Sequence, residues 1–169
     1  MNSKHDSMKN KIALEKSSMY EVEIVYKRPV FSEMPKITCS QSANELIHES
    51  VGHRSIDYKE YFWCFYLTNA NMVLCYSEIN CGTASGTIVN TCEIFATALR
   101  KSAAALVLVH NHPSGKLKPS TSDRELTNKI KVFGDMIGIK LLDHLIITSE
   151  KNYYSFADEG QLEDNKIPF

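Results

Sequence analysis

Hydrophobic positions change their spacing several times along the chain, and each change predicts a new secondary-structure element. Over residues 20–26 apolar and charged residues alternate, which predicts a half-buried edge strand that Pro29 ends. From Ser42 apolar residues recur at helical spacing as far as Gly52, and Ser42 with Glu45 forms a capping pair at the start. We therefore expect a short helix after the first strand.

Two apolar runs in the middle of the chain predict a hairpin. They read EYFWCFYL and MVLCYSEI, and the turn-forming residues 69–71 separate them. A segment rich in glycine and threonine then leads to a helix that we expect to begin near Thr91. Four apolar positions share one face of that helix and should be buried: Ile94, Phe95, Ala98 and Leu99.

Strands and helices continue to alternate in the last third of the sequence. The run AALVLV at 104–109 predicts a strand buried on both faces, and it ends at His110. A helix should follow, closed by Gly138, with its apolar face at Leu126, Ile130, Phe133 and Ile137. LLDHLIIT at 141–148 predicts another strand, with which YYSF at 153–156 can pair. The pattern as a whole predicts an α/β or α+β fold with a mixed central sheet flanked by helices.

Length and composition favour one ordinary domain over residues 20–169, after a flexible segment at 1–19. The net charge of -1 lacks the basic excess that accompanies non-specific DNA binding. No apolar run is long enough to cross a membrane, and the first residues do not form a signal peptide. The 5 cysteines are odd in number and contain no CxxC pair, which suits reduced thiols. We expect a cytoplasmic bacterial protein without a membrane partner.

The candidate chemistry lies where the buried strand runs into a loop rich in proline and glycine. His110 and His112 are two residues apart on an extended segment, so both imidazoles can face one metal ion while Asn111 faces away. Asp123, in the first turn of the next helix, could turn back as a third ligand. Two histidines and one carboxylate leave a fourth tetrahedral position for water, which is typical of catalytic zinc.

The string from His110 to Asp123, H-x-H, seven residues, S, two residues, D, resembles the JAMM signature of the JAB/MPN metallopeptidases. Its HNHPSG form, with the later GIKLLDHLIIT and YYSFADEG, resembles the bacterial RadC group, and the likeness is strongest over 60–162. The resemblance implies a JAB/MPN, cytidine deaminase-like architecture. It also implies one zinc ion (Zn2+) per chain on His110, His112 and Asp123.

The same resemblance implies two catalytic side chains. The family serine corresponds to Ser120, which would help to stabilise an oxyanion. A family glutamate on an earlier strand accepts a proton from the water, and Glu60 matches it best, with Glu78 as the alternative. Asn111 stands where many JAMM enzymes have serine or threonine, although RadC-like chains share the asparagine; this leaves metal binding intact but makes eukaryote-like deubiquitinase activity a weak inference. His144, beside Asp143, is more often a packed core residue and stays outside this set.

Three functions compete at this point. The leading hypothesis is a zinc-dependent hydrolase that cleaves a peptide or isopeptide bond in a peptide or protein substrate. The alternative is a non-catalytic or regulatory partner of DNA-repair proteins or of mobile-element maintenance, acting through protein contacts. A metal-dependent nuclease would need clustered carboxylates and a basic groove, which the sequence lacks. Residues 1–59 also contain no helix-hairpin-helix, so no DNA-binding module is expected.

Overall fold

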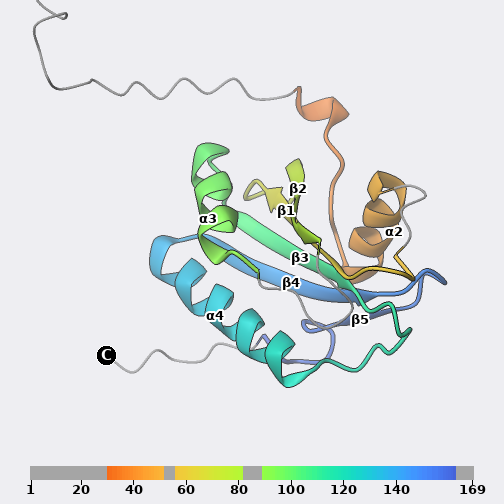
Figure 1. Cartoon of the computed structure of the whole chain (residues 1–169). Coiled ribbons are helices and arrows are strands. Elements are labelled where there is room, and N and C mark those ends of the chain that lie inside the picture. The colour runs from red at the N-terminus through yellow and green to blue at the C-terminus, as the bar shows by residue number, and fades with distance from the viewer. Residues whose placement is uncertain (1–29, 52–55, 82–88, 163–169) are drawn as a thin grey trace, which may run out of the picture.

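The computed structural model describes residues 30–51, 56–81 and 89–162 (Figure 1). The strand expected over 20–26 and the helix stop at Gly52 lie outside these residues. The described elements are η1 (Phe31–Glu33), α2 (Ser40–Val51), β1 (Tyr61–Leu67), β2 (Val73–Cys81), α3 (Thr91–Arg100), β3 (Ala105–Asn111), α4 (Thr121–Ile137), β4 (Lys140–Ile147) and β5 (Tyr153–Ser155). None of the helices in this part of the chain is long and apolar enough to span a membrane.

The strands form one mixed five-stranded sheet in the order β2-β1-β3-β4-β5. β1 runs antiparallel to both β2 and β3, and β5 runs antiparallel to β4. β3 and β4 are parallel, and α4 provides the crossover that a parallel pair requires. The fold is therefore α+β, with the mixed central sheet and flanking helices that the sequence pattern predicts.

Two cores cover the two faces of the sheet. α2 packs on one face through Ile47, against Trp63 and Phe65 of β1. On the other face α3 and α4 cover Leu106 and Leu108 of β3. Figure 1 shows α2 on the opposite side of the sheet from α4. Because side chains alternate along a strand, neighbouring residues of β1 and β3 contribute to different cores. Each fully buried side chain of this kind contributes about 1.5–3 kcal/mol to the free energy of unfolding.

Four details of the sequence prediction are wrong. α2 begins at Ser40, so Ser42 lies in its first turn and donates its hydroxyl hydrogen to the Cys39 carbonyl instead of serving as the N-cap. Leu99, expected in the buried face of α3, is 63% exposed. Phe133 and Ile137, expected in the buried face of α4, are 49% and 39% exposed. Helical periodicity was right for the other positions that are buried, which are Ile94, Phe95, Ala98 and Ile130.

The ends of α4 position the site. Ser120 caps the helix, with a capping box in which Ser120 and Asp123 bond to each other's backbone amides. Gly138 ends it in the left-handed conformation at φ 75°, as the sequence predicts, so that the chain can turn directly into β4. Asp123 is thereby held at the N-terminal end of a rigid helix, beside the carboxyl end of β3.

Candidate metal centre

The first histidine of the site, His110, lies in β3, inside the sheet. All seven residues of β3 are buried, and His110 is 1% exposed on the face covered by α4. Its ring stacks on Phe62 of β1, which is also its partner in the strand register. His112 follows just beyond the end of β3, where the chain leaves the sheet. The metal centre is therefore anchored at one end in the core.

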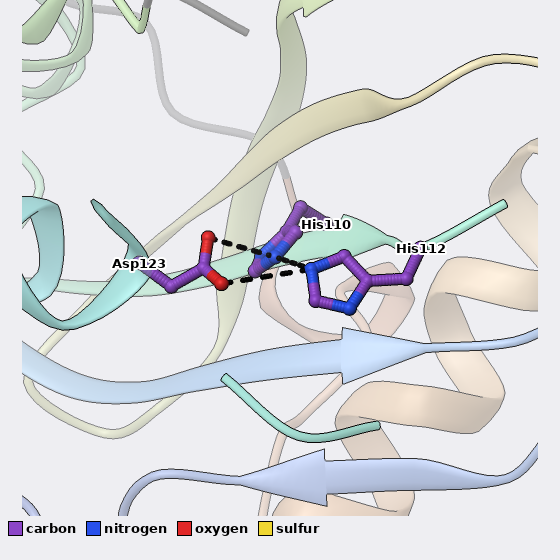
Figure 2. A group of neighbouring side chains, drawn as sticks. All are labelled: His110, His112 and Asp123. Atoms are coloured by element: carbon purple, nitrogen blue, oxygen red, sulfur yellow. Dashed lines mark hydrogen bonds and ion pairs between the residues drawn. The ribbon is translucent and has the colours of Figure 1, made fainter. Parts of the chain in front are cut away.

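The two histidines and Asp123 bring three ligand atoms together (Figure 2). The Nε2 atoms of His110 and His112 are 3.0 Å apart. Oδ1 of Asp123 lies 3.3 Å from Nε2 of His110, and Oδ2 of the same carboxylate lies 3.6 Å from Nε2 of His112. Zinc bonds of 2.0–2.1 Å at tetrahedral angles place ligand atoms about 3.3 Å apart. The three separations bracket that value, so the residues fit a tetrahedral metal ion.

Each histidine uses its Nδ1 for a protein contact, which leaves Nε2 facing the centre. Nδ1 of His112 lies 2.6 Å from the carbonyl oxygen of Lys116, and because a carbonyl only accepts, this nitrogen carries the hydrogen. The amide of Gly115 donates back to the His112 carbonyl at 2.9 Å, in a turn that Gly115 allows with φ 71°. His112 is thus oriented by a short local loop.

Hydrogen bonds through His144 to Thr127 orient His110. The Thr127 end of this series fixes which atom donates in each bond. The Thr127 hydroxyl donates to the Asp123 carbonyl at 2.5 Å, so its oxygen must accept from Nδ1 of His144, at 2.6 Å. Nε2 of His144 is then an acceptor and takes the hydrogen on Nδ1 of His110, at 2.9 Å. His110 is left with an unprotonated Nε2 aimed at the centre.

Burial supports this assignment for His144. The residue is fully buried, and desolvation, followed by the charge of His110, places its pKa well below the ordinary histidine value. His144 is therefore neutral and can have only one ring hydrogen. The sequence alone does not place His144 in the site, because nothing in LLDHLIIT distinguishes a packed histidine from one that contacts a ligand. The pairing of β3 with β4, which sets Leu108 opposite His144, brings it there.

Asp123 faces the centre as a carboxylate. Both the amide and the hydroxyl of Ser120 donate to Oδ2 of Asp123, each at 2.6 Å. Burial opposes ionisation of Asp123, but the adjacent imidazoles of His110 and His112 and the hydrogen bonds from Ser120 hold its pKa well below the usual range. Hydrogen bonding to this carboxylate raises the pKa of His112, with smaller contributions from the Lys116 carbonyl and from the charge of Glu60. The centre carries a concentration of negative charge that a cation can balance.

The two candidate glutamates lie at different places relative to the sheet. Phe62 pairs with His110, and Glu60 and His112 each lie two residues beyond this last pair of β1 and β3. The charge of Glu60 contributes to the raised pKa of His112, so Glu60 lies near the centre. Glu78 pairs with Trp63, whose side chain belongs to the core under α2. The metal centre is therefore within reach of Glu60 and on the far side of the sheet from Glu78. A catalytic role for Glu60 stays a prediction.

Ser120 lies at the centre with its hydroxyl engaged. Its oxygen accepts from the Asp123 amide at 3.1 Å, and its hydrogen goes to the Asp123 carboxylate. A hydroxyl has a single hydrogen, so donating to a substrate oxygen would require Ser120 to give up that bond. Within residues 30–51, 56–81 and 89–162 no other three side chains form a comparable ligand group.

Comparison with known proteins decides the family. The sequence profile of the RadC-like JAB domain matches residues 37–161, which include every residue of the metal centre. This chain belongs to the RadC-like JAB domain family. The fold and the resemblance predicted from the His110 to Asp123 string are thereby confirmed.

Several curated proteins are similar to this RadC-like JAB domain. The UPF0758 protein of Flavobacterium johnsoniae is 42% identical over 128 residues, which are 76% of this chain and 54% of the relative. That of Desulforudis audaxviator is 42% identical over 126 residues, 75% of this chain and 53% of the relative. That of Geotalea uraniireducens is 39% identical over 133 residues, 78% and 56% of the two chains. This RadC-like JAB domain spans about half the length of these relatives.

Proposed function

We propose that this RadC-like JAB domain is a zinc-dependent hydrolase that cleaves an amide bond, peptide or isopeptide, in a peptide or protein substrate. The observation that carries the proposal is the convergence of two imidazole Nε2 atoms and one carboxylate at tetrahedral zinc spacing. His112 and Asp123 are 16% and 13% exposed, whereas His110 is buried, so the centre is partly open on the side of His112 and Asp123. An open side allows both water and substrate to approach.

The residues around the centre suit the proposed reaction. A zinc ion held by His110, His112 and Asp123 would polarise the substrate carbonyl and increase the acidity of a water molecule. Glu60, whose charge is close enough to contribute to the raised pKa of His112, would accept the proton of that water as the water oxygen attacks the carbonyl carbon. Glu60 would then pass the proton to the amine nitrogen as the carbon–nitrogen bond breaks. Ser120 would donate to the carbonyl oxygen after releasing Asp123.

The first test of this proposal is the amount of zinc in the purified protein. We expect one zinc per chain by elemental analysis, and loss of that zinc in a His110→Ala/His112→Ala variant. His48→Ala is the matched control, because His48 lies on α2 across the sheet, and it should retain the metal. Equal zinc content in the double variant and the wild type would contradict the proposal, as would absence of zinc from both.

A second candidate function is binding of a protein partner, such as a DNA-repair protein, without catalysis. One observation favours it: α3 and α4 expose several large apolar side chains on one side, and such patches are typical of protein interfaces. These side chains are Leu99, Phe133, Met136 and Ile137. A wild-type protein that binds no zinc would favour this second function over hydrolysis.

A further inference from the structure

Asn111, between the two histidines, has contacts unlike those of either neighbour. It is 1% exposed and points away from the metal centre, toward the chain that enters β1. Its Oδ1 accepts from the Tyr61 amide at 2.7 Å. Its Nδ2 donates to the carbonyl oxygens of Ile56 at 2.5 Å and Lys59 at 2.7 Å. Both amide hydrogens are therefore used, and all three bonds go to one short backbone segment.

The positions of two of these bonds single out Glu60. The Lys59 carbonyl belongs to the peptide group just before the Cα of Glu60, and the Tyr61 amide belongs to the peptide group just after it. One side chain thus holds both peptide groups that set the φ and ψ angles of Glu60. The direction in which the Glu60 side chain leaves the backbone depends directly on those angles.

The hydrogen bonds of Asn111 fix the backbone around Glu60 close to the metal centre. Phe62 pairs with His110, and Glu60 and His112 each lie two residues beyond that pair, so the backbone segments that carry them are adjacent. The negative charge of Glu60 is close enough to contribute to the raised pKa of His112. The neighbouring residue Asn111 points to the other side and fastens the backbone there. The three hydrogen bonds of Asn111 therefore join the segment that carries the two histidines to the segment that carries Glu60.

We propose that Asn111 is a positioning residue, which clamps the two peptide groups flanking Glu60 and so presents the Glu60 carboxylate to the metal centre. This inference rests on the proposed function, in which Glu60 handles the proton. A serine at this position has one donor and a shorter reach, so it could not bond to both peptide groups and to Ile56 at once. An asparagine between the histidines is thus part of the site, although it binds no metal.

The test uses the full chain loaded with cobalt(II), whose visible absorption reports ionisation beside the metal and needs no substrate. We expect Glu60→Gln to shift the pH midpoint of this absorption by about one unit or more, because a carboxylate next to the metal is lost. Asn111→Ala should shift the midpoint in the same direction while metal content stays at one per chain. The double variant should match Glu60→Gln alone, because Asn111 acts through Glu60.

Two further variants keep the test decisive. Asn44→Ala is the matched control: Asn44 is also a buried asparagine that donates to a backbone carbonyl, that of Lys151, but it lies on α2. We expect it to leave the midpoint unchanged. Asn111→Ser replaces Asn111→Ala if the alanine variant does not fold, with a smaller shift in the same direction. Faster hydrogen exchange of the Tyr61 amide in either Asn111 variant would show directly that the clamp has been released.

The possible outcomes separate this inference from the proposed function. A wild-type midpoint in the Asn111 variants, or shifts that add in the double variant, would overturn the role of Asn111 and leave hydrolysis untouched. A metal-loaded Glu60→Gln protein with an unchanged midpoint would overturn the roles of both Glu60 and Asn111. A wild-type chain that binds neither zinc nor cobalt would remove the proposed function itself.

Discussion

The two histidines of the metal centre lie two residues apart, yet the structure supports them in different ways. His110 is 1% exposed and bonds to His144, which is 34 positions away in the sequence. His112 is 16% exposed and bonds to the carbonyl of Lys116, four positions away. Asp123 resembles His112, since its support comes from Ser120, three positions away. One half of the centre depends on tertiary packing and the other half on local turns.

This difference indicates how the site is made both rigid and accessible. The half that contains His110, His144 and Thr127 is closed to water. Its hydrogen bonds are therefore strong, and each ring hydrogen has a single acceptor. The half that contains His112 and Asp123 is partly open, which leaves a route for metal and substrate. Among the residues that support the ligands without binding the metal, substitutions in the closed half should therefore affect metal affinity most, and substitutions in the open half should have smaller effects.

The largest effect is expected at His144. His144→Leu removes the acceptor for Nδ1–H of His110 and the donor to Thr127, so the His110 ring loses its fixed tautomer and orientation. Losses of such contacts behind a metal ligand typically weaken metal affinity by about 10- to 100-fold. We expect a loss of that size in zinc affinity, measured by competition with a chromogenic chelator.

The control for this substitution is His48→Leu. His48 is a half-buried histidine of α2 on the opposite face of the sheet, so its loss should leave zinc affinity unchanged. Comparable zinc affinity in His144→Leu and in the wild type would show that the closed half does not set the metal affinity.

A smaller effect is expected at Ser120. Ser120→Ala removes a helix cap, which costs about 1 kcal/mol of unfolding free energy, and also removes one donor to the Asp123 carboxylate. Zinc affinity should fall less than in His144→Leu, because the Ser120 amide still donates to Asp123. Chemical denaturation and the same chelator competition measure the two quantities.

Asn90→Ala provides the matched comparison for Ser120. Asn90 caps α3 by accepting from the Cys92 amide at 3.2 Å, and it takes no part in the metal centre. Its replacement should lower the unfolding free energy by a similar amount with no change in zinc affinity. If both cap variants lost zinc affinity equally, the effect of Ser120 would reflect general destabilisation and not its bond to Asp123.

The same division into local and tertiary contacts explains how much of the site the sequence could predict. His110, His112, Ser120 and Asp123 form one contiguous string, and their chemistry and spacing were sufficient to predict a metal-binding group. Asn111 was predicted to face away from the metal, but its contacts could not be predicted, because its partners lie 50 to 55 positions away. His144 was seen but not assigned, since no periodicity specifies which β4 residue meets His110.

The fold follows a similar rule. The order of strands and helices was predictable because each element has its own period of apolar residues and its own turn, such as Asn71 with φ 59° in the β1–β2 turn. Strand order in the sheet was not predictable, since the pairing of β1 with β3 depends on the whole core. The start of α2 was placed two residues late, because the Ser42 hydroxyl, from within the first turn, accepts from the amides of Thr38 and Cys39 just before the helix.

The smallest expected effect is on the pH dependence of the unfolding free energy of the metal-free protein. In this effect the closed half and the open half differ in sign. Burial lowers the pKa of His144 in the folded state, so its contribution to stability is complete above pH 6.5 and is lost as the pH falls and the unfolded chain takes up a proton. Asp123 raises the pKa of His112, so that contribution is complete below pH 6.5 and is lost as the pH rises. His144 and His112 thus change the stability in opposite directions as the pH falls.

Urea denaturation in the presence of chelator at pH 7.5 and at pH 5.5 can separate these contributions. On acidification between these values His144 should cost about 1 kcal/mol of unfolding free energy in the wild type, and His144→Leu should remove that loss. His112→Ala should instead lose more stability on acidification than the wild type, because the compensating proton uptake by the folded state is gone. The same pH dependence in both variants would mean that the closed and open halves do not differ in protonation.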